Sequence, residues 1–223
     1  MKIIMKINVV QSLSVILLVV ALAGCSKAPK ELPYLGNKEP IKKVVDGGKE
    51  VVDTLYHTIP DFEFINQDSV KITQEFVAGK IYIADFFFTT CPTICPKMKT
   101  QMLRIYEKYK DNPDVVLLSH SIDPRHDTPA VLKEFRSNLG IKGNSWQMVT
   151  GDKAKIYEIG QKSYMVSAAD DPTQPGGVVH SGAFILVDKN RHIRGLYDGT
   201  VAAKVDNLME DMEILLKETS SNK

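Results

Sequence analysis

Two apolar runs in the middle of the chain mark the core of a predicted sheet. Residues 80–88 (KIYIADFFF) and 114–123 (DVVLLSHSID) are nearly continuous in apolar, branched or aromatic side chains. Such runs are typical of strands that are buried on both faces of an α/β sheet. Residues 62–73 instead alternate apolar and polar positions around a polar turn, which predicts a two-stranded β-hairpin. A shorter strand is expected at residues 146–150 (WQMVT).

Helical periodicity separates these strands. Pro96 suits the first turn of a helix, where a missing amide proton costs nothing, and the apolar side chains after it recur at helical spacing. Thr128 and Asp152 are typical caps of two further helices, the first ending at Gly140 and the second near Tyr164. The apolar stripe after Pro96 consists of Met98, Met102, Ile105, Tyr106 and Tyr109.

A second hairpin and a last helix complete the pattern. Residues 183–187 and 192–197 flank a polar turn, and residues 205–217 form an amphipathic helical repeat. The resulting order is βαβ, then α, then ββα, and the βαβ unit is expected to be right-handed. This order predicts a thioredoxin-like α/β fold, in which a central mixed sheet is flanked by helices and carries an N-terminal β-hairpin extension.

The N-terminal segment predicts export and anchoring. Two lysines precede an uncharged, mostly apolar stretch that is short for a membrane-spanning helix and ends just before Cys25. The sequence LAGC resembles a lipoprotein signal, which implies cleavage before Cys25 and lipidation of its thiol. We therefore expect a signal peptide at 1–24, a flexible tether at 25–50 and a globular domain at 51–220. The domain would be lipid-anchored on the extracytoplasmic (periplasmic) side of a bacterial membrane.

Charge and cysteine content narrow the function classes. Removal of residues 1–24 deletes two lysines and no acid, so the net charge changes from +1 to about −1, and no nucleic-acid partner is indicated. The chain has three cysteines, and lipidation of Cys25 would leave one pair in a domain large enough to fold without staples. Outside the cytoplasm such a pair oxidises unless a reductant or a metal protects it. A metal-binding or redox function of the cysteine pair is therefore favoured over a structural disulfide.

Cys91 and Cys95 lie at the predicted junction between the strand at 80–88 and the helix that follows. Residues four apart share one face of a helical turn, and a helix N-terminus favours the thiolate, which both attacks disulfides and binds metals. Two thiolates suit Cu(I), and an added imidazole would hold either copper state, whereas zinc would want a fourth ligand. The spacing is therefore compatible with a metal site, a redox pair or a structural disulfide. A disulfide is the weakest of these, because a loop this short removes little conformational entropy from the unfolded chain.

Five histidines are candidates for a third ligand. His180 is the strongest, because it follows a Gly-Gly loop and directly precedes a strand at the end of the domain that the predicted fold brings beside the cysteines. His126 lies in a loop at the same sheet end and is a candidate peripheral ligand. His120 lies within a buried strand, where a hydrogen-bonded core histidine is the expected role. His57 and His192 are expected to be exposed to solvent.

Three motifs resemble those of the Sco (SenC) family of thioredoxin-fold copper proteins, and they occur in the family's order. The resemblance covers roughly Thr58 to the C-terminal helix. It implies that Cys91, Cys95 and His180 are copper ligands and that Asp123 tunes the site without being a primary ligand. The motifs are FFFTTCPTICPKM at 86–98, SHSIDPRHDTP at 119–129 and VVHSGAFILVD at 178–188.

The same resemblance implies a function in cytochrome c oxidase assembly. The expected activity is that of a metallochaperone that delivers copper to the binuclear copper centre, with the copper-centre subunit as partner and other copper chaperones or thiol reductases as further partners. The alternative is a thiol-disulfide reductase, with Cys91 and Cys95 as the redox-active pair that keeps the oxidase cysteines reduced. A peroxide-reducing function fits less well, because the threonine before Cys91 lacks the upstream proline of the PxxxTxxC pattern.

Overall fold

The structure, a computed structural model, describes residues 31–45, 47–170 and 178–220, with the backbone alone for 168–170, 178–180 and 219–220. The expected signal peptide and the lipidated Cys25 lie outside the described residues. Within the described ranges, no helix combines the length and the apolar character needed to cross a membrane.

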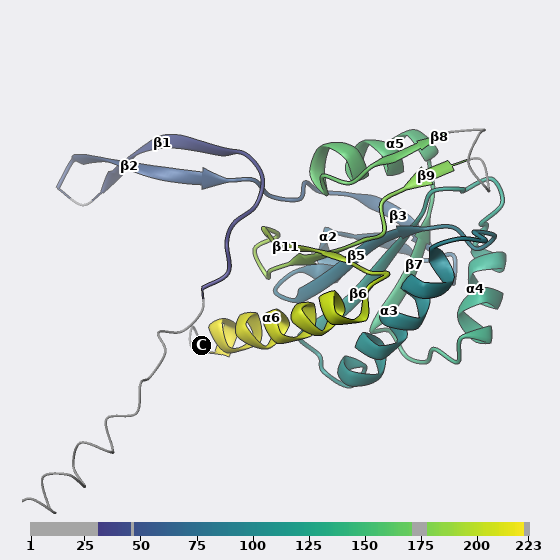
Figure 1. The fold of residues 1–223 in the computed structure, drawn as a ribbon. Helices are drawn as coiled ribbons and strands as arrows, with labels where there is room; N and C mark the ends of the chain where they lie inside the picture. Colours follow the sequence, from purple (N-terminus) through teal and green to yellow (C-terminus); the bar gives the residue numbers. More distant parts are fainter. Residues whose placement is uncertain (1–30, 46, 171–177, 221–223) are drawn as a thin grey trace, which may run out of the picture. The chain divides into compact units, whose positions relative to one another are not determined.

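A seven-stranded mixed sheet forms the centre of the domain (Figure 1). Its strands are β3 Glu63–Asn66, β4 Lys71–Thr73, β5 Ile81–Phe87, β6 Val115–Ser121, β7 Trp146–Thr150, β10 Ala183–Val187 and β11 Ile193–Asp198. They lie in the order β11-β10-β5-β6-β7-β3-β4. β6 pairs in parallel with β5 and β7, and the remaining pairs are antiparallel. The sheet confirms the predicted thioredoxin-like α/β fold, including both predicted hairpins.

Helices cover both faces of this sheet. They are α2 Gln74–Val77, α3 Cys95–Tyr109, α4 Pro129–Asn138, α5 Lys153–Glu158, the π-helical turn η1 Ile159–Ser163 and α6 Ala202–Ser220. α5 lies on one face, and α3, α4 and α6 lie on the other (Figure 1). The side chains of Thr128 and Asp152 accept hydrogen bonds from Val131 N and Lys155 N, so both predicted caps are confirmed. The helix after Asp152 differs from the prediction in its second half, which is π-helical.

The alternation of β5 explains which side chains face which helices. All seven residues of β5 are buried, as its apolar run predicts. Phe86 stacks on His120 at 4.8 Å between ring centroids and contacts Tyr164 beyond η1. Its neighbour Phe87 points the other way and lies 5.8 Å from the ring of Phe135 on α4. Asp85 shares the Phe87 face, because side chains two apart on a strand point the same way.

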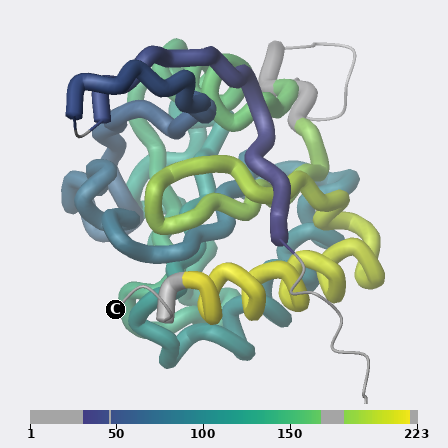
Figure 2. Tube along the Cα trace, turned by 90° about the vertical axis from the view of Figure 1, so that its left-hand side faces the viewer, coloured from purple at the N-terminus to yellow at the C-terminus, as the bar shows by residue number. Residues whose placement is uncertain are grey.

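The C-terminal helix packs along the edge of the sheet. α6 runs beside the β10–β11 hairpin (Figure 2), and the Tyr197 hydroxyl on β11 donates a hydrogen bond to Asp211 on α6 at 2.7 Å. On its other side α6 meets α3, where the Tyr109 hydroxyl donates to the Met209 carbonyl at 3.1 Å. The apolar stripe of α3 is buried throughout, as predicted from its spacing.

Residues 38–56 form a β-ribbon where the sequence predicts the end of a tether. β1 Lys38–Val45 and β2 Lys49–Tyr56 pair with each other as a two-stranded sheet of their own. Ion pairs Lys42–Glu50 and Lys43–Asp53 cross the ribbon. Strands form here although the composition is tether-like, because both segments are rich in β-branched residues and carry opposite charges that pair across the ribbon.

Candidate functional site

The cysteine loop, defined as residues 88–95, connects the end of β5 to the start of α3. Cys95 is the first residue of α3, and a proline occupies the first turn, as the sequence predicts. Both cysteines are thiols and each is 8% exposed. The Cys91 N–H donates to the Phe88 carbonyl at 3.3 Å, and the Thr93 hydroxyl lies 3.6 Å from the Cys91 sulfur. The loop therefore presents two sulfurs at a strand-to-helix junction.

Burial opposes ionisation of Cys95. It raises the pKa of the Cys95 thiol far above its ordinary value, and a hydrogen bond with Cys91 adds to this effect. The helix N-terminus was expected to favour thiolates, so the structure adds an opposing influence that spacing alone did not reveal. Formation of the thiolate at Cys95 thus needs a compensating positive charge, such as a metal ion.

A small cavity of about 20 Å³ lies behind Cys95. Asp85 lines it together with Ser119, and the Ser119 hydroxyl donates to the Asp85 carboxylate at 2.5 Å. Burial raises the pKa of Asp85 to about 7, although the hydrogen bond from Ser119 partly offsets the rise. Met98, an alternative soft ligand by type, also lines this cavity and is 2% exposed, which makes it part of the core.

The turn after β6, residues 122–128, lies directly beside the cysteine loop. In the parallel register Phe87 pairs with Ser121, and the Ile122 N–H donates to the Phe87 carbonyl at 2.9 Å. Asp123, the predicted tuning residue, therefore stands at the sheet end where the cysteine loop begins, and it is half-buried. The backbone N–H groups of His126 and Asp127 donate to the Asp123 carbonyl, which closes the turn.

Asp127 is a buried carboxylate that sequence reasoning did not single out. It is 0% exposed and accepts hydrogen bonds from Thr89 N at 3.1 Å, from the Thr89 hydroxyl and from the Ser121 hydroxyl at 2.6 Å. His126 Nδ1 lies 3.0 Å from the same carboxylate, which raises the pKa of His126. Asp127 thus joins the turn after β6 to the cysteine loop.

His180 is the last residue of β9 Val178–His180, which pairs with β8 Ala168–Asp170 in a separate two-stranded sheet. Its side chain lies outside the described atoms, so its place is given by its neighbours. Gly182 follows two residues after His180, and a Cβ added to it would lie 3.7 Å from Cδ1 of Ile94. Ile94 lies between Cys91 and Cys95 in the sequence. The backbone after His180 therefore runs against the cysteine loop, as the predicted fold requires.

A hollow of about 460 Å³ adjoins this contact. Ile94 forms one wall and residues 181–183 another, while Leu196 and Thr200 lie on the β11 side. Leu196 is 41% exposed and contributes an apolar side chain to this surface. The cysteine loop is thus reached from solvent over a partly apolar surface.

The other histidines are placed as follows. His120 is fully buried, its Nδ1 lies 3.4 Å from the Asp85 carbonyl, and its Nε2 has no hydrogen-bond partner among the described residues. Burial lowers the pKa of His120 to about 4. His57 and His192 are half-buried instead of exposed: His57 Nε2 lies 2.8 Å from the Ser163 carbonyl, and His192 packs edge-on against Tyr34. Neither lies in the cysteine loop.

The described side chains supply part of a metal site. Among them, no three histidines, cysteines or acids gather tightly enough to hold a metal ion. Cys91 and Cys95 supply two sulfurs. The side chain of His180, the predicted third ligand, is not among the described atoms.

A family model described as SCO1/SenC matches residues 52–217. A SCO1/SenC family lipoprotein from Bacillus anthracis is 29% identical with a TM-score of 0.65, and the match covers 72% of this chain and 95% of that one. BsSco, described as a member of the Sco family of cytochrome c oxidase assembly proteins with a disulfide switch, is 32% identical with a TM-score of 0.63, over 71% and 93% of the two chains. ScoI of Arabidopsis thaliana with copper bound is 25% identical with a TM-score of 0.58, over 71% and 98%.

Proposed function

The chain belongs to the SCO1/SenC family, and from this premise we propose that it is a membrane-tethered metallochaperone for copper. It would bind the ion through Cys91, Cys95 and His180 and deliver it to the binuclear copper centre of cytochrome c oxidase. Two relatives support this assignment, since one is described as an oxidase assembly protein and another was solved with copper bound.

The observation that carries the proposal is the approach of Gly182 to Ile94. It brings the segment that begins at His180 against the loop that holds both thiols, so that two sulfurs and one imidazole can converge. Such a soft, three-coordinate donor set suits Cu(I) and also accepts Cu(II). Asp123, half-buried in the adjoining turn, would adjust the site electrostatically without binding the ion.

Release would proceed by ligand exchange. Cys95 is held as a thiol by its burial, so copper entry displaces a proton and copper departure takes one back. The hollow beside Ile94 would admit the acceptor's ligands to the ion from solvent. Because each ligand is replaced in turn, the ion is never released as a free cation.

A lipid on Cys25 would confine the domain to the membrane surface. The Bacillus anthracis relative is described as a lipoprotein, which supports this assignment. Tethering raises the effective concentration of the domain near a membrane-bound acceptor without adding any contact. The acceptor we propose is the copper-centre subunit of the oxidase, reached on the periplasmic side.

Copper competition tests the binding site. The full chain in detergent is titrated with Cu(I) against a chromophoric chelator. One ion per chain is expected, lost in Cys91→Ser and weakened in His180→Ala, while Cys25→Ser serves as the matched control with unchanged affinity. Unchanged affinity in His180→Ala would refute the three-ligand site.

A second candidate function is thiol-disulfide exchange, favoured by the hydrogen bond between the two thiols of the pair. Cys91 and Cys95 would give up two electrons and two protons and form a disulfide, while a partner disulfide takes both up and becomes two thiols. Rapid exchange with a disulfide peptide in the presence of a copper chelator, unaffected by His180→Ala, is required. In cells lacking the gene, rescue of oxidase activity by added copper supports delivery, whereas rescue only by a reductant supports thiol chemistry.

A further inference from the structure

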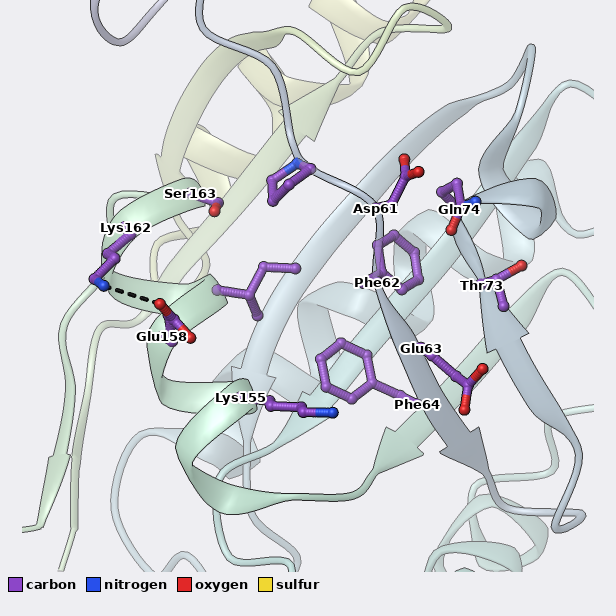
Figure 3. A pocket seen from close by; sticks show the side chains of 12 residues that line it. Asp61, Phe62, Glu63, Phe64, Thr73, Gln74, Lys155, Glu158, Lys162 and Ser163 are labelled. Atoms are coloured by element: carbon purple, nitrogen blue, oxygen red, sulfur yellow. Dashed lines mark hydrogen bonds and ion pairs between the residues drawn. The ribbon is translucent and has the colours of Figure 1, made fainter.

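A groove of about 610 Å³ lies on the α5 side of the sheet (Figure 3). One wall is the segment that leads into β3, from Pro60 to Phe64, and the other is α5 with η1. Thr73 and Gln74, at the junction of β4 and α2, close one end. None of its lining residues lines the cavity behind Cys95 or the hollow beside Ile94. The groove is therefore separate from the proposed copper site.

The floor of the groove is apolar. Phe62 and Phe64 stack with their ring centroids 5.8 Å apart, and Ile159 faces them from η1. Phe64 is anchored from behind, because its ring also packs edge-on against His120 at 5.5 Å. A floor fixed in this way is preformed, and a volume of this size is typical of small-molecule sites.

The acids on the rim are neutralised by their neighbours. Asp61 pairs with Arg191, and Glu63 pairs with Lys71 at 3.0 Å. Glu158 pairs with Lys162 at 2.9 Å, as the dashed line in Figure 3 shows. Each carboxylate that lines the groove is therefore matched by one cation.

Lys155 is the exception to this balance. It extends from α5 across the groove toward Phe64 (Figure 3), and its ammonium makes no ion pair with the side chains that the structure describes. An aromatic floor with one uncompensated cation above it is complementary to a molecule with an apolar body and a single negative charge.

We propose that this groove binds a small amphiphilic monoanion, such as a medium-chain or aromatic carboxylate or sulfonate, with its apolar body on Phe62 and Phe64 and its anionic group on Lys155. Thr73 and Gln74 supply hydrogen-bonding groups at the far end for a polar substituent. Lys155 selects for a negative charge, and Phe62 and Phe64 provide the apolar surface that contacts the body of the ligand.

The test uses the aromatic sulfonate 8-anilinonaphthalene-1-sulfonate as the probe. Its fluorescence is titrated in detergent-free buffer with the chain produced from residue 26 onward, which lacks the apolar N-terminal stretch and Cys25 and retains every described residue. Saturable binding at one site is expected, with decanoate displacing the probe and decanol displacing it far less. In Lys155→Glu the affinity should fall about five- to tenfold, through loss of an exposed ion pair and gain of a repulsion.

Lys142→Glu is the matched control, because it makes the same change of charge at an exposed lysine outside the groove. Gln74→Trp, which fills one end of the groove, should abolish saturable binding while the thermal midpoint stays within a few degrees of the parent. Equal affinity in Lys155→Glu and Lys142→Glu, equal displacement by decanol, or unaltered binding in Gln74→Trp would each overturn the proposal.

Discussion

Asp127 accepts two hydrogen bonds from Thr89, one from its backbone N–H and one from its hydroxyl. Thr89 lies two residues before Cys91, so a fully buried carboxylate in the turn after β6 fixes the start of the cysteine loop. Ser121, the last residue of β6, donates a third hydrogen bond to the same carboxylate. The orientation of the first sulfur thus depends on a residue from a neighbouring strand connection.

Thr89→Val should loosen this connection. The isosteric change removes the hydroxyl and leaves the buried Asp127 short of one donor, which should lower the free energy of unfolding by about 1–3 kcal/mol. The affinity for Cu(I) should fall roughly tenfold, because the loop must be ordered again when the ion binds. Thr89→Ser keeps the hydroxyl and should resemble the parent in both urea unfolding and chelator competition. Equal behaviour of the two variants would contradict the assigned role.

Gly182→Leu should separate the His180 segment from the cysteine loop. A Cβ at Gly182 would lie 3.2 Å from the Thr200 methyl and 3.7 Å from Cδ1 of Ile94, so a larger side chain would crowd both residues. We expect copper affinity to fall by roughly tenfold or more, whereas Gly182→Ala should change it by less than about threefold. The measurement is Cu(I) competition, with unfolding midpoints recorded for both variants. If Gly182→Leu binds copper like Gly182→Ala, the approach of these two segments is not part of the site.

His120 should destabilise the apoprotein as the pH falls. Its pKa drops from the ordinary 6.5 to about 4 in the fold, so the unfolded chain binds a proton more readily than the folded one. The contribution of His120 to the free energy of unfolding is therefore fully present above pH 6.5. It is lost as the pH falls toward 4, by about 3 kcal/mol in total. His120→Phe keeps the stack on Phe86 and removes the titration. In urea unfolding, the stability of His120→Phe relative to the parent should increase as the pH is lowered from 6.5 to 4. A difference that stays constant with pH would show that His120 does not titrate in this way.

Asp85 should act in the opposite direction. Its pKa rises from 3.8 to about 7 in the fold, so its contribution is fully present below pH 3.8 and is lost as the pH rises through 7, by about 4 kcal/mol. Asp85→Asn retains an oxygen for the Ser119 hydroxyl and removes the charge. In the same unfolding series it should match the parent near pH 4 and exceed it at pH 8. Equal stabilities at pH 8 would mean that the buried carboxylate is compensated by other groups.

Much of the fold could be predicted because its signals are local. The apolar runs of β5 and β6 require burial on both faces, and the stripe of α3 requires one buried side, so strand and helix follow from spacing. Caps such as Thr128 and Asp152 also act within a few residues of themselves. The spacing of Cys91 and Cys95 suggested one shared helical turn, but the structure places Cys91 in the loop before α3 and Cys95 at its first residue.

The residues that sequence reasoning missed act through contacts between distant segments. Asp127 is one acid in a polar loop, and only the parallel register of β5 and β6 shows that it meets Thr89. Asp85 did leave a signal, as the one charged residue inside an apolar run, but its neighbour Ser119 is supplied by another strand. The burial that raises the pKa of Cys95 is likewise a property of the assembled core.

The proposed copper ligands are held by secondary structure of very different extent. The two sulfurs lie between a seven-stranded sheet and a 15-residue helix. His180 instead ends a three-residue strand that, among the described strands, pairs with β8 alone in a two-stranded sheet. Short isolated strand pairs are marginal in water. In the proposed site, the imidazole would therefore leave the ion first. The ion would then be held by the two sulfurs alone and would be accessible to the ligands of the acceptor protein.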